Sequence, residues 1–260
     1  MPNRIPEYRK NLDDAPRLVA VMARGWRAGE RIPLHMHKRA QLLHATTGIM
    51  RVETETAAWM VPPARGLWLP SELPHSVSMR SHVEMRTIYF DPSVCGALPA
   101  APALLEISGL LRELILALLG EPPAYDEHGR GGTIAHLILS EMARLKERKL
   151  GVPMPRDERA LRIARALLDD SSLDHDLDRW ADEAGASRRT LARLFRSETG
   201  LGFAEWRARL RAIDGLARLA DGASVAETAA SVGYASPSAF SAMIHRTLGQ
   251  PPRRLTRPPA

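Results

Sequence analysis

The apolar residues divide the chain into a part with strand-like segments followed by a part with helical periods. Between residues 17 and 90, short segments rich in Val, Ile, Trp and Tyr alternate with Gly, Pro and Ser. These segments are LVAVMARGW, RAQLLHATTG, IMRVETE, AAWMVPP, GLWLP, HSVSM and VEMRTIYF. None of them has a helical period. The pattern predicts a β-sandwich or a small β-barrel.

The pattern becomes helical after Cys95. Apolar residues recur with 3-4 spacing, and further leucines and isoleucines widen the stripe; they are Leu104, Ile107, Leu111, Leu114 and Leu118, with Leu105, Leu110, Ile115 and Leu119 beside them. This spacing predicts a helix. A second helix is expected at about 132–149. The pair covers one side of the β domain, and two interpretations stay open: the pair does only this, or the 104–118 stripe also packs against its copy in a homodimer.

The last third of the chain is predicted to be entirely helical. Two prolines make residues 150–156 a linker. Helices are expected near 157–169, 177–184, 188–198, 203–221, 225–232 and 237–247, with N-caps at Asp176, Ser187, Ser224 and Ser236. We therefore predict an α+β multidomain chain: a β-barrel over 1–98, a helical dimerisation region over 99–149, the linker, and an all-α domain over 157–260.

The segment from Asp176 to Gly200 has the spacing of a helix, a tight turn and a second helix. Ala181 allows close helix crossing, and Gly185 can adopt the positive φ of the turn. A fainter copy follows, with Ala229, Gly233 and Phe240 in corresponding places. The long helix predicted from Phe203 to Leu219 would hold the two helix-turn-helix units at a fixed separation. Two such units can enter successive major grooves, about 34 Å apart.

Charge favours a polyanionic partner, and the two helix-turn-helix units indicate that this partner is double-stranded DNA. The formal net charge is +6, and seven arginines face two acids between Ala186 and Ala212. The second helix of each unit is the expected contact. The candidate DNA-binding residues are Ser187, Arg188, Arg189, Thr190, Arg193 and Arg196 in the first unit, and Ser236, Ser238, Ser241, His245 and Arg246 in the second.

Residues 157–255 resemble the DNA-binding domain of the AraC/XylS family of transcription regulators. The resemblance rests on Gly233-Tyr234, Ser236, Ser238, Phe240 and the closing Gly249-Gln-Pro-Pro252. Met243-Ile244-His245 departs from the family pattern, which often has an aromatic and a basic residue there. The resemblance implies control of transcription initiation and RNA polymerase as a partner. It does not fix activation or repression.

Three histidines form a candidate metal site in the β domain. His35 and His37 would point to one face of a strand, Gln41 shares their parity, and His75 comes from another strand. Converging imidazoles could bind a divalent transition metal such as Zn²⁺, Fe²⁺, Mn²⁺ or Ni²⁺. Alternatively, they are hydrogen-bonded pocket walls. The spacing of Gly29, His35, His37, Gly48, Pro70 and His75 resembles the two cupin motifs, whose carboxylate is replaced here by Gln41 and one of whose glycines by Glu72.

A small-molecule effector pocket is the preferred role of this domain. Its candidate residues are Trp26, His35, His37, Gln41, Trp59, Trp68, His75 and Tyr89. Core packing is the alternative for each tryptophan, and His44, of opposite parity, is expected outside the pocket. The region resembles a cupin-sensor subgroup of the AraC/XylS family.

The sequence shows no evident pairing of a general base with a nucleophile, so an enzyme is not the expected class. The competing classes are a metal-dependent cupin enzyme that carries a DNA-binding domain and an architectural DNA-bending protein. Cys95 is the single cysteine, which excludes an intrachain disulfide, and neither a signal-peptide pattern nor an uninterrupted apolar run of membrane-spanning length is present. A cytoplasmic protein without a membrane partner is therefore expected.

Overall fold

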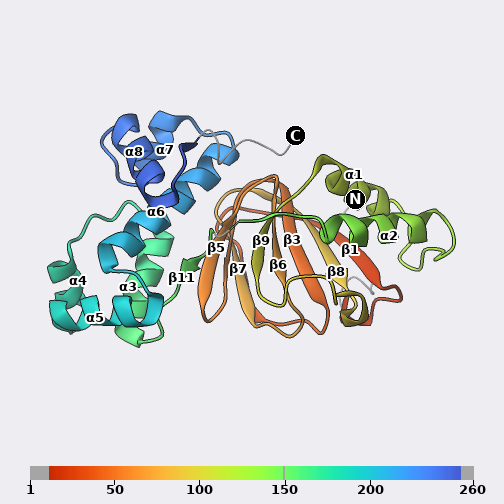
Figure 1. The fold of residues 1–260 in the computed structure, drawn as a ribbon, viewed down its shortest axis with the longest axis horizontal. Helices are drawn as coiled ribbons and strands as arrows, with labels where there is room; N and C mark the ends of the chain where they lie inside the picture. Colours follow the sequence, from red (N-terminus) through yellow and green to blue (C-terminus); the bar gives the residue numbers. More distant parts are fainter. Residues whose placement is uncertain (1–11, 149, 253–260) are drawn as a thin grey trace. The chain divides into compact units, whose positions relative to one another are not determined.

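The computed structural model describes residues 12–148 and 150–252. The outer limits of the predicted domains, at residues 1–11 and 253–260, and the end of the predicted second helix at Lys149 lie outside the described residues. The chain divides into two compact units (Figure 1). The first comprises residues 1–51 and 61–149, and the second comprises residues 52–60 and 150–257, apart from those outside the described range. No helix in the described part is long and apolar enough to cross a membrane.

Two antiparallel sheets make up the β structure. The six-stranded sheet has the order β1 (Val19–Trp26), β8 (Val83–Phe90), β3 (Ala40–Thr47), β6 (Arg65–Leu69), β9 (Ala103–Glu106) and β10 (Glu147–Arg148). The five-stranded sheet has the order β11 (Val152–Pro153), β5 (Ala57–Val61), β4 (Met50–Glu53), β7 (His75–Met79) and β2 (Arg31–His35). The seven segments expected as strands from their composition are confirmed. Within the described residues the two sheets do not close into the predicted barrel, and they form a two-sheet sandwich.

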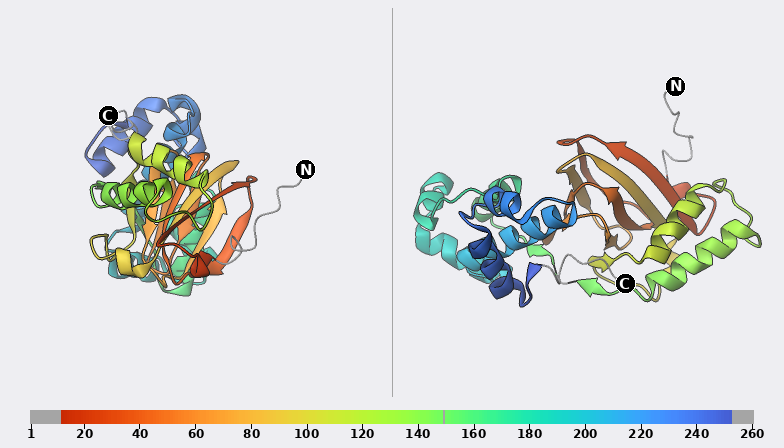
Figure 2. Two further views of the ribbon diagram at one scale, coloured as in Figure 1. Left: turned by 90° about the vertical axis from the view of Figure 1, so that its right-hand side faces the viewer. Right: turned by 90° about the horizontal axis from the view of Figure 1, so that it is seen from above.

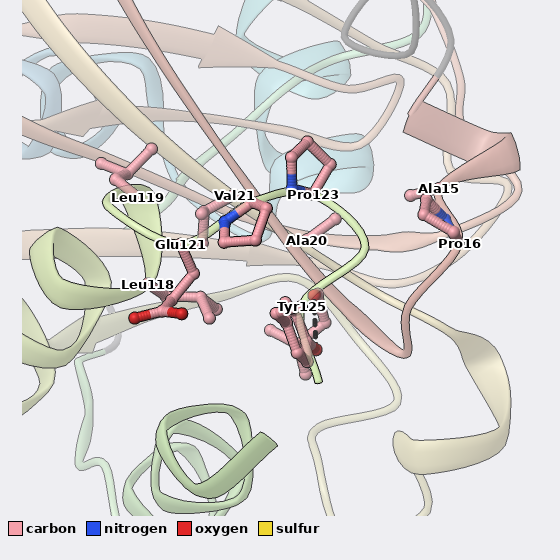
Figure 3. Close-up of a pocket in the computed structure, with 11 residues that line it drawn as sticks. Ala15, Pro16, Ala20, Val21, Leu118, Leu119, Glu121, Pro123 and Tyr125 are labelled. Atoms are coloured by element: carbon pink, nitrogen blue, oxygen red, sulfur yellow. Dashed lines mark hydrogen bonds between the residues drawn. The ribbon is translucent and has the colours of Figure 1, made fainter. Parts of the chain in front are cut away.

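Side-chain alternation gives the six-stranded sheet two different faces. One face, with Leu42, Ile88 and Phe90, packs against helices α1 (Gly109–Leu119) and α2 (Arg130–Met142). These helices run side by side next to β1 and β8, as Figures 1 and 2 show. Two short 3-10 turns, η2 (Leu12–Asp14) and η3 (Pro92–Val94), complete the unit. The opposite face is therefore available to line a cavity.

The helices of this unit are shorter than predicted. Leu104 and Leu105 lie in strand β9, whose four residues are all buried. A short apolar run that is covered on both faces cannot be distinguished from a buried helix by its period. Ser108 sets the actual helix start, because its side chain accepts a hydrogen bond from Leu111 N. At the other end, α2 stops at Met142, and residues 147–148 pair with β9 as β10. The predicted linker contains a further strand, β11, which pairs with β5.

The helical part of the second unit agrees with the sequence prediction to within about two residues at each end. Its helices are α3 (Glu158–Asp169), α4 (Leu177–Ala184), α5 (Arg188–Thr199), α6 (Phe203–Ala220), α7 (Val225–Ser231) and α8 (Pro237–Leu248). The four predicted N-caps each accept a hydrogen bond from a backbone N–H of the first turn, and Glu227 completes the capping box with Ser224. These local signals are therefore confirmed.

One buried arginine joins the two helix-turn-helix units. Arg211 of α6 is 6% exposed, and its guanidinium donates to the carbonyl oxygens of Ser171, Ser172 and Leu173 in the loop before α4, over 2.8–3.2 Å. Its Cζ lies 5.7 Å from the ring centre of Tyr234, in the turn between α7 and α8. The same side chain thus contacts the start of the first unit and the turn of the second.

Candidate nucleic-acid interface and ligand cavity

The first helix-turn-helix unit is formed by α4 and α5. Leu191, Leu194 and Phe195 are buried on α5, and Trp180 and Ala181 are buried on α4. Gly185 has φ 64°, a left-handed conformation that suits glycine because it lacks a Cβ. This tight turn leaves the arginine-bearing face of α5 exposed.

The arginines of α5 differ in whether they form hydrogen bonds or ion pairs within the protein. Arg189, Arg193 and Arg196 share one face, because they are spaced by four and three residues. Arg196 donates to the Gly200 carbonyl oxygen and pairs with Glu205, while Arg188, on a neighbouring face, pairs with Asp178. Ion pairing with a described acidic residue is not seen for Arg189 or Arg193. These two exposed side chains are the most available to an anionic partner.

The cap residues of α5 have a positioning role. Ser187 accepts a hydrogen bond from Thr190 N, and the two hydroxyl groups lie 2.9 Å apart. Ser187 is exposed and Thr190 is half-buried. Both predicted residues therefore lie at the N-terminus of the recognition helix, where backbone N–H groups favour phosphate.

The second unit repeats the first with an offset of 49 residues. Phe240, Met243 and Ile244 are buried on α8 where α5 buries Leu191, Leu194 and Phe195. The same offset places Ser238, Ala242 and His245 where the first unit has Arg189, Arg193 and Arg196. Ser241, a predicted contact, is half-buried, whereas Ala242, which was not predicted, is exposed. The offset between the two buried sets was the signal that identifies Ala242.

The remaining candidates of α8 are its N-cap and its last basic residue. Ser236 caps the helix and accepts from Ala239 N. Arg246 lines a surface hollow of about 470 Å³ together with Glu205 and Arg209 of α6. The face of α8 that corresponds to the arginine face of α5 thus carries no arginine.

A cavity of about 450 Å³ lies between the inner faces of the two sheets. It is lined by Leu12, Met22, Arg24, Trp26, Ile32, His35, His37, Gln41, Leu43, His75, Val77, Met85 and Tyr89. Six of the eight predicted pocket residues are among them. The apolar lining residues and Arg24 were not predicted. Strand parity could have identified Met22 and Arg24, since they alternate with outward-facing residues on the way to Trp26.

Two predicted tryptophans lie outside this cavity. Trp68 is 1% exposed and belongs to the core beneath α1 and α2, where its Nε1 donates to the Pro99 carbonyl oxygen over 2.7 Å. Trp59 lies on β5, in the second unit, and a Cβ at Gly151 would come within 2.8 Å of its Nε1. Both side chains therefore have the packing role that was the alternative. His44 is buried outside the cavity and its Nδ1 contacts the Arg65 carbonyl oxygen.

The three candidate histidines converge, although they do not share one strand. His35 ends β2 after a register shift, His37 lies in the following loop, and Gln41 belongs to β3. The prediction of a single strand face was wrong, because the chain turns between His35 and Gln41. One nitrogen from each of His35, His37 and His75 nevertheless lies within 4.8 Å of the others.

Backbone contacts fix the tautomers of two of the three imidazoles. Nδ1 of His35 lies 2.8 Å from the Pro33 carbonyl oxygen, and Nδ1 of His75 lies 2.9 Å from that of Leu73. Because a carbonyl oxygen only accepts, each Nδ1 carries a hydrogen, and the neutral form of either ring has its lone pair on Nε2. Burial lowers the pKa of His75 to about 4 and also lowers the pKa of His37. Both rings are therefore neutral at pH 7.

Three buried polar atoms of the lining residues have no hydrogen-bond partner in the described structure. They are Trp26 Nε1, Gln41 Oε1 and His75 Nε2. The other end of the Gln41 amide is fixed, since its Nε2 donates to Tyr89 Oη over 2.9 Å. Burial raises the pKa of Tyr89, so its hydroxyl stays neutral. Buried polar atoms without partners are rare in proteins, which favours a bound ligand as their partner.

Comparison with known proteins agrees with both parts of this description. A family model of a helix-turn-helix domain matches residues 180–257, and a model of an AraC-like ligand binding domain matches residues 19–163, more than half of the chain. The HTH-type transcriptional regulator NimR of Escherichia coli is 31% identical over 222 residues, which are 85% of this chain and 81% of that protein.

Two further similarities extend over different lengths. The HTH-type transcriptional regulator RipA of Corynebacterium glutamicum is 29% identical over 58% of this chain and 46% of its own. The solved structure of ToxT from Vibrio cholerae is 13% identical with a TM-score of 0.37, and the match covers 92% of this chain and 98% of that one. The ligand-binding model and the extent of the match to NimR show that the chain belongs to the AraC-type family of helix-turn-helix transcription regulators.

Proposed function

We propose that this regulator binds its effector in the cavity between the two sheets and that occupancy of the cavity changes the affinity of the helix-turn-helix units for an operator. The observation that carries the proposal is the cavity itself, since six predicted polar and aromatic residues converge there with partnerless buried atoms. If the effector binds the DNA-bound regulator more tightly or more weakly than the free regulator, it must change operator affinity by the same factor. The relatives are transcription regulators, which favours this function over an enzyme.

DNA contact by the first unit is assigned to Arg189 and Arg193, supported by the helix N-terminus at Ser187 and Thr190. The second unit would contribute Ser236, Ser238 and His245, mainly through hydrogen bonds to phosphate, because the face of α8 that corresponds to the arginine face of α5 lacks arginine. Arginine binds guanine through two parallel hydrogen bonds, whereas a serine hydroxyl discriminates poorly between bases. Most of the base discrimination is therefore expected from α5.

Replacement of Arg189 by Ala should lower operator affinity by about 1–3 kcal/mol while leaving nonspecific DNA binding nearly unchanged, as expected for a guanine contact. Fluorescence anisotropy with operator and scrambled duplexes at one salt concentration measures both. Arg165→Ala, at an exposed position of α3, is the matched control. An equal loss on both duplexes would make Arg189 a phosphate contact and refute its assignment to base recognition.

Filling the cavity should uncouple the regulator from its effector. Met22 is half-buried and lines the cavity, so Met22→Trp places a larger side chain in the ligand volume. We expect operator affinity close to wild type but at least about a tenfold weaker response to the inducing compound, which corresponds to about 1.4 kcal/mol. Leu34→Trp, at a position that is 71% exposed, adds the same bulk outside the cavity. A normal effector response in Met22→Trp would exclude this cavity as the effector site.

The three histidines are also proposed to hold a divalent transition metal. The donor set suits such an ion, because Nε2 of His35 and of His75 is available while Nδ1 of each ring is held by a backbone carbonyl group. Bonds of about 2.0–2.1 Å from the metal to nitrogen would require the rings to move closer than they are here. The neutral amide of Gln41 is a weaker donor than a carboxylate, so affinity should be modest.

Metal binding can be measured on the full-length protein with Co²⁺, whose absorption reports its coordination. Wild type should bind one ion, and His75→Ala should weaken binding by at least about tenfold, because one of three imidazole ligands is lost. His136→Ala, on the exposed face of α2, serves as the control for adventitious binding by histidine. Equal binding by wild type and His75→Ala, or none by wild type, would contradict this site.

We also propose that the regulator forms a homodimer, contacts RNA polymerase and lies in the cytoplasm. A homodimer is supported by Leu110, Leu116 and Leu137, which are 41–54% exposed on α1 and α2 although the neighbouring leucines are buried. Contact with RNA polymerase and a cytoplasmic location are expected from the family. Sedimentation equilibrium tests the dimer: Leu110→Glu should shift the protein toward the monomer, whereas an unchanged mass would exclude this face.

A further inference from the structure

The cavity between the sheets has an unbalanced charge. Arg24 is its only permanently charged lining residue, and no carboxylate of the described chain lines it. Asp13 is the acid associated with the histidines, 3.9 Å from His37 Nδ1, but it does not line the cavity. A ligand that touches the lining residues therefore contacts one permanent cation and no carboxylate, while the charge of Asp13 acts through space on His37 and Tyr89.

Arg24 is exposed, and its guanidinium packs over an aromatic ring of the cavity lining. Its guanidinium carbon lies 3.8 Å from the centre of the Trp26 ring, two residues further along β1. Stacking uses the flat face of a guanidinium and leaves its N–H edge for acceptors in the plane, the geometry that carboxylates prefer. Glu84, opposite the neighbouring Gly25, contacts Arg86 and His82 instead. No ion pair between Arg24 and a described carboxylate competes for this edge.

The other polar end of the cavity is buried. Gln41 and His75 line this end; they are 3% and 2% exposed, and each has a buried acceptor without a described partner, Oε1 and Nε2. Along β8, Met85 is opposite Arg24 and Tyr89 is opposite Gln41. Met85 and Tyr89 are four residues apart, which is about 13 Å along a strand. The strand position of the cation, Arg24, is therefore about 13 Å from that of the hydrogen-bond acceptor Gln41. Apolar residues such as Met22, Leu43 and Val77 line the remainder.

We propose that the effector is a small organic carboxylic acid with an apolar body, bound with its carboxylate on Arg24 and its body against Trp26 and Met22. A hydrogen-bond donor at the far end would satisfy Gln41 Oε1 and His75 Nε2. Arg24 then determines specificity, because it selects acids over neutral or cationic molecules of the same shape. The inference rests on the proposed role of this cavity as the effector site, and it names the chemical class of the effector.

Matched acid and amide pairs test the assignment on the full-length protein. The probes are 4-phenylbutyrate with 4-phenylbutanamide and octanoate with octanamide, measured by isothermal titration calorimetry. Wild type should bind each acid at least about tenfold more tightly than its amide, the size expected of a charge-assisted hydrogen bond. Arg24→Gln should reduce this preference to below about threefold, and Arg24→Lys, which keeps the charge but not the planar fork, should retain part of it. Arg27→Gln changes an exposed arginine that does not line the cavity and should keep the full preference.

The outcomes separate this inference from the proposed function. Equal binding of acids and amides by wild type, or a preference that survives in Arg24→Gln, overturns the acid assignment. If the amides bind and Met22→Trp abolishes that binding, the cavity remains the ligand site and only the chemical class is wrong. If no acid binds wild type at millimolar concentration, the acid class is likewise rejected. Loss of the acid preference in Arg27→Gln as well would show that net charge, and not the contact at Arg24, causes it.

Discussion

The helix-turn-helix pair depends on the buried guanidinium of Arg211. A charge taken out of water is costly unless hydrogen bonds replace its hydration, and here three backbone carbonyl groups of the loop before α4 do so. Asp214, one turn further along α6, accepts from Ser171 Oγ over 2.7 Å. These bonds attach the first helix-turn-helix unit to the long helix that also supports the second. Without Arg211 the carbonyl groups would have to find water or remain unsatisfied, so the loop has one preferred position.

The same arginine restricts the turn of the second unit. Gly233 has φ 79°, and a Cβ there would lie 3.0 Å from Arg211 Nη2 and 2.9 Å from the Ser172 carbonyl oxygen. Glycine is therefore required for two reasons, the backbone conformation and the close approach. The two recognition helices, α5 and α8, are thus both held in position by one helix, α6. A fixed separation is what allows a single protomer to engage two grooves.

The sequence predicted the features that have a local physical cause. N-caps, turn glycines and the apolar stripe of an exposed helix depend on residues a few positions apart, and α4 to α8 were accordingly found. The failures were of longer range. Strand β9 was taken for helix because burial on both faces removes its period. Trp68 was wrongly assigned to the pocket, because the face of the sheet on which it lies depends on the pairing of β6 with β3 and β9, which the sequence does not show.

The candidate cavity shows the same division. His35, His37 and His75 were identified from residue type, yet their convergence arises from a turn between β2 and β3 that spacing alone does not specify. Arg24 was missed because an arginine in a strand is usually solvated on the outer face. Strand parity places it on the same face as Trp26, and the register of β1 with β8 adds that it opposes Met85. The parity of the strands places the ligand cavity and the helix-covered core on opposite sides of one sheet.

We expect one protomer to contact DNA with two recognition helices, α5 and α8, both held by α6. Hydroxyl-radical footprinting of the full-length protein on an operator half-site, at a stoichiometry of one protomer per duplex, tests it directly. We expect two protected segments on one face of the duplex, centred about one helical turn, or about 34 Å, apart. A single protected segment per protomer would contradict it.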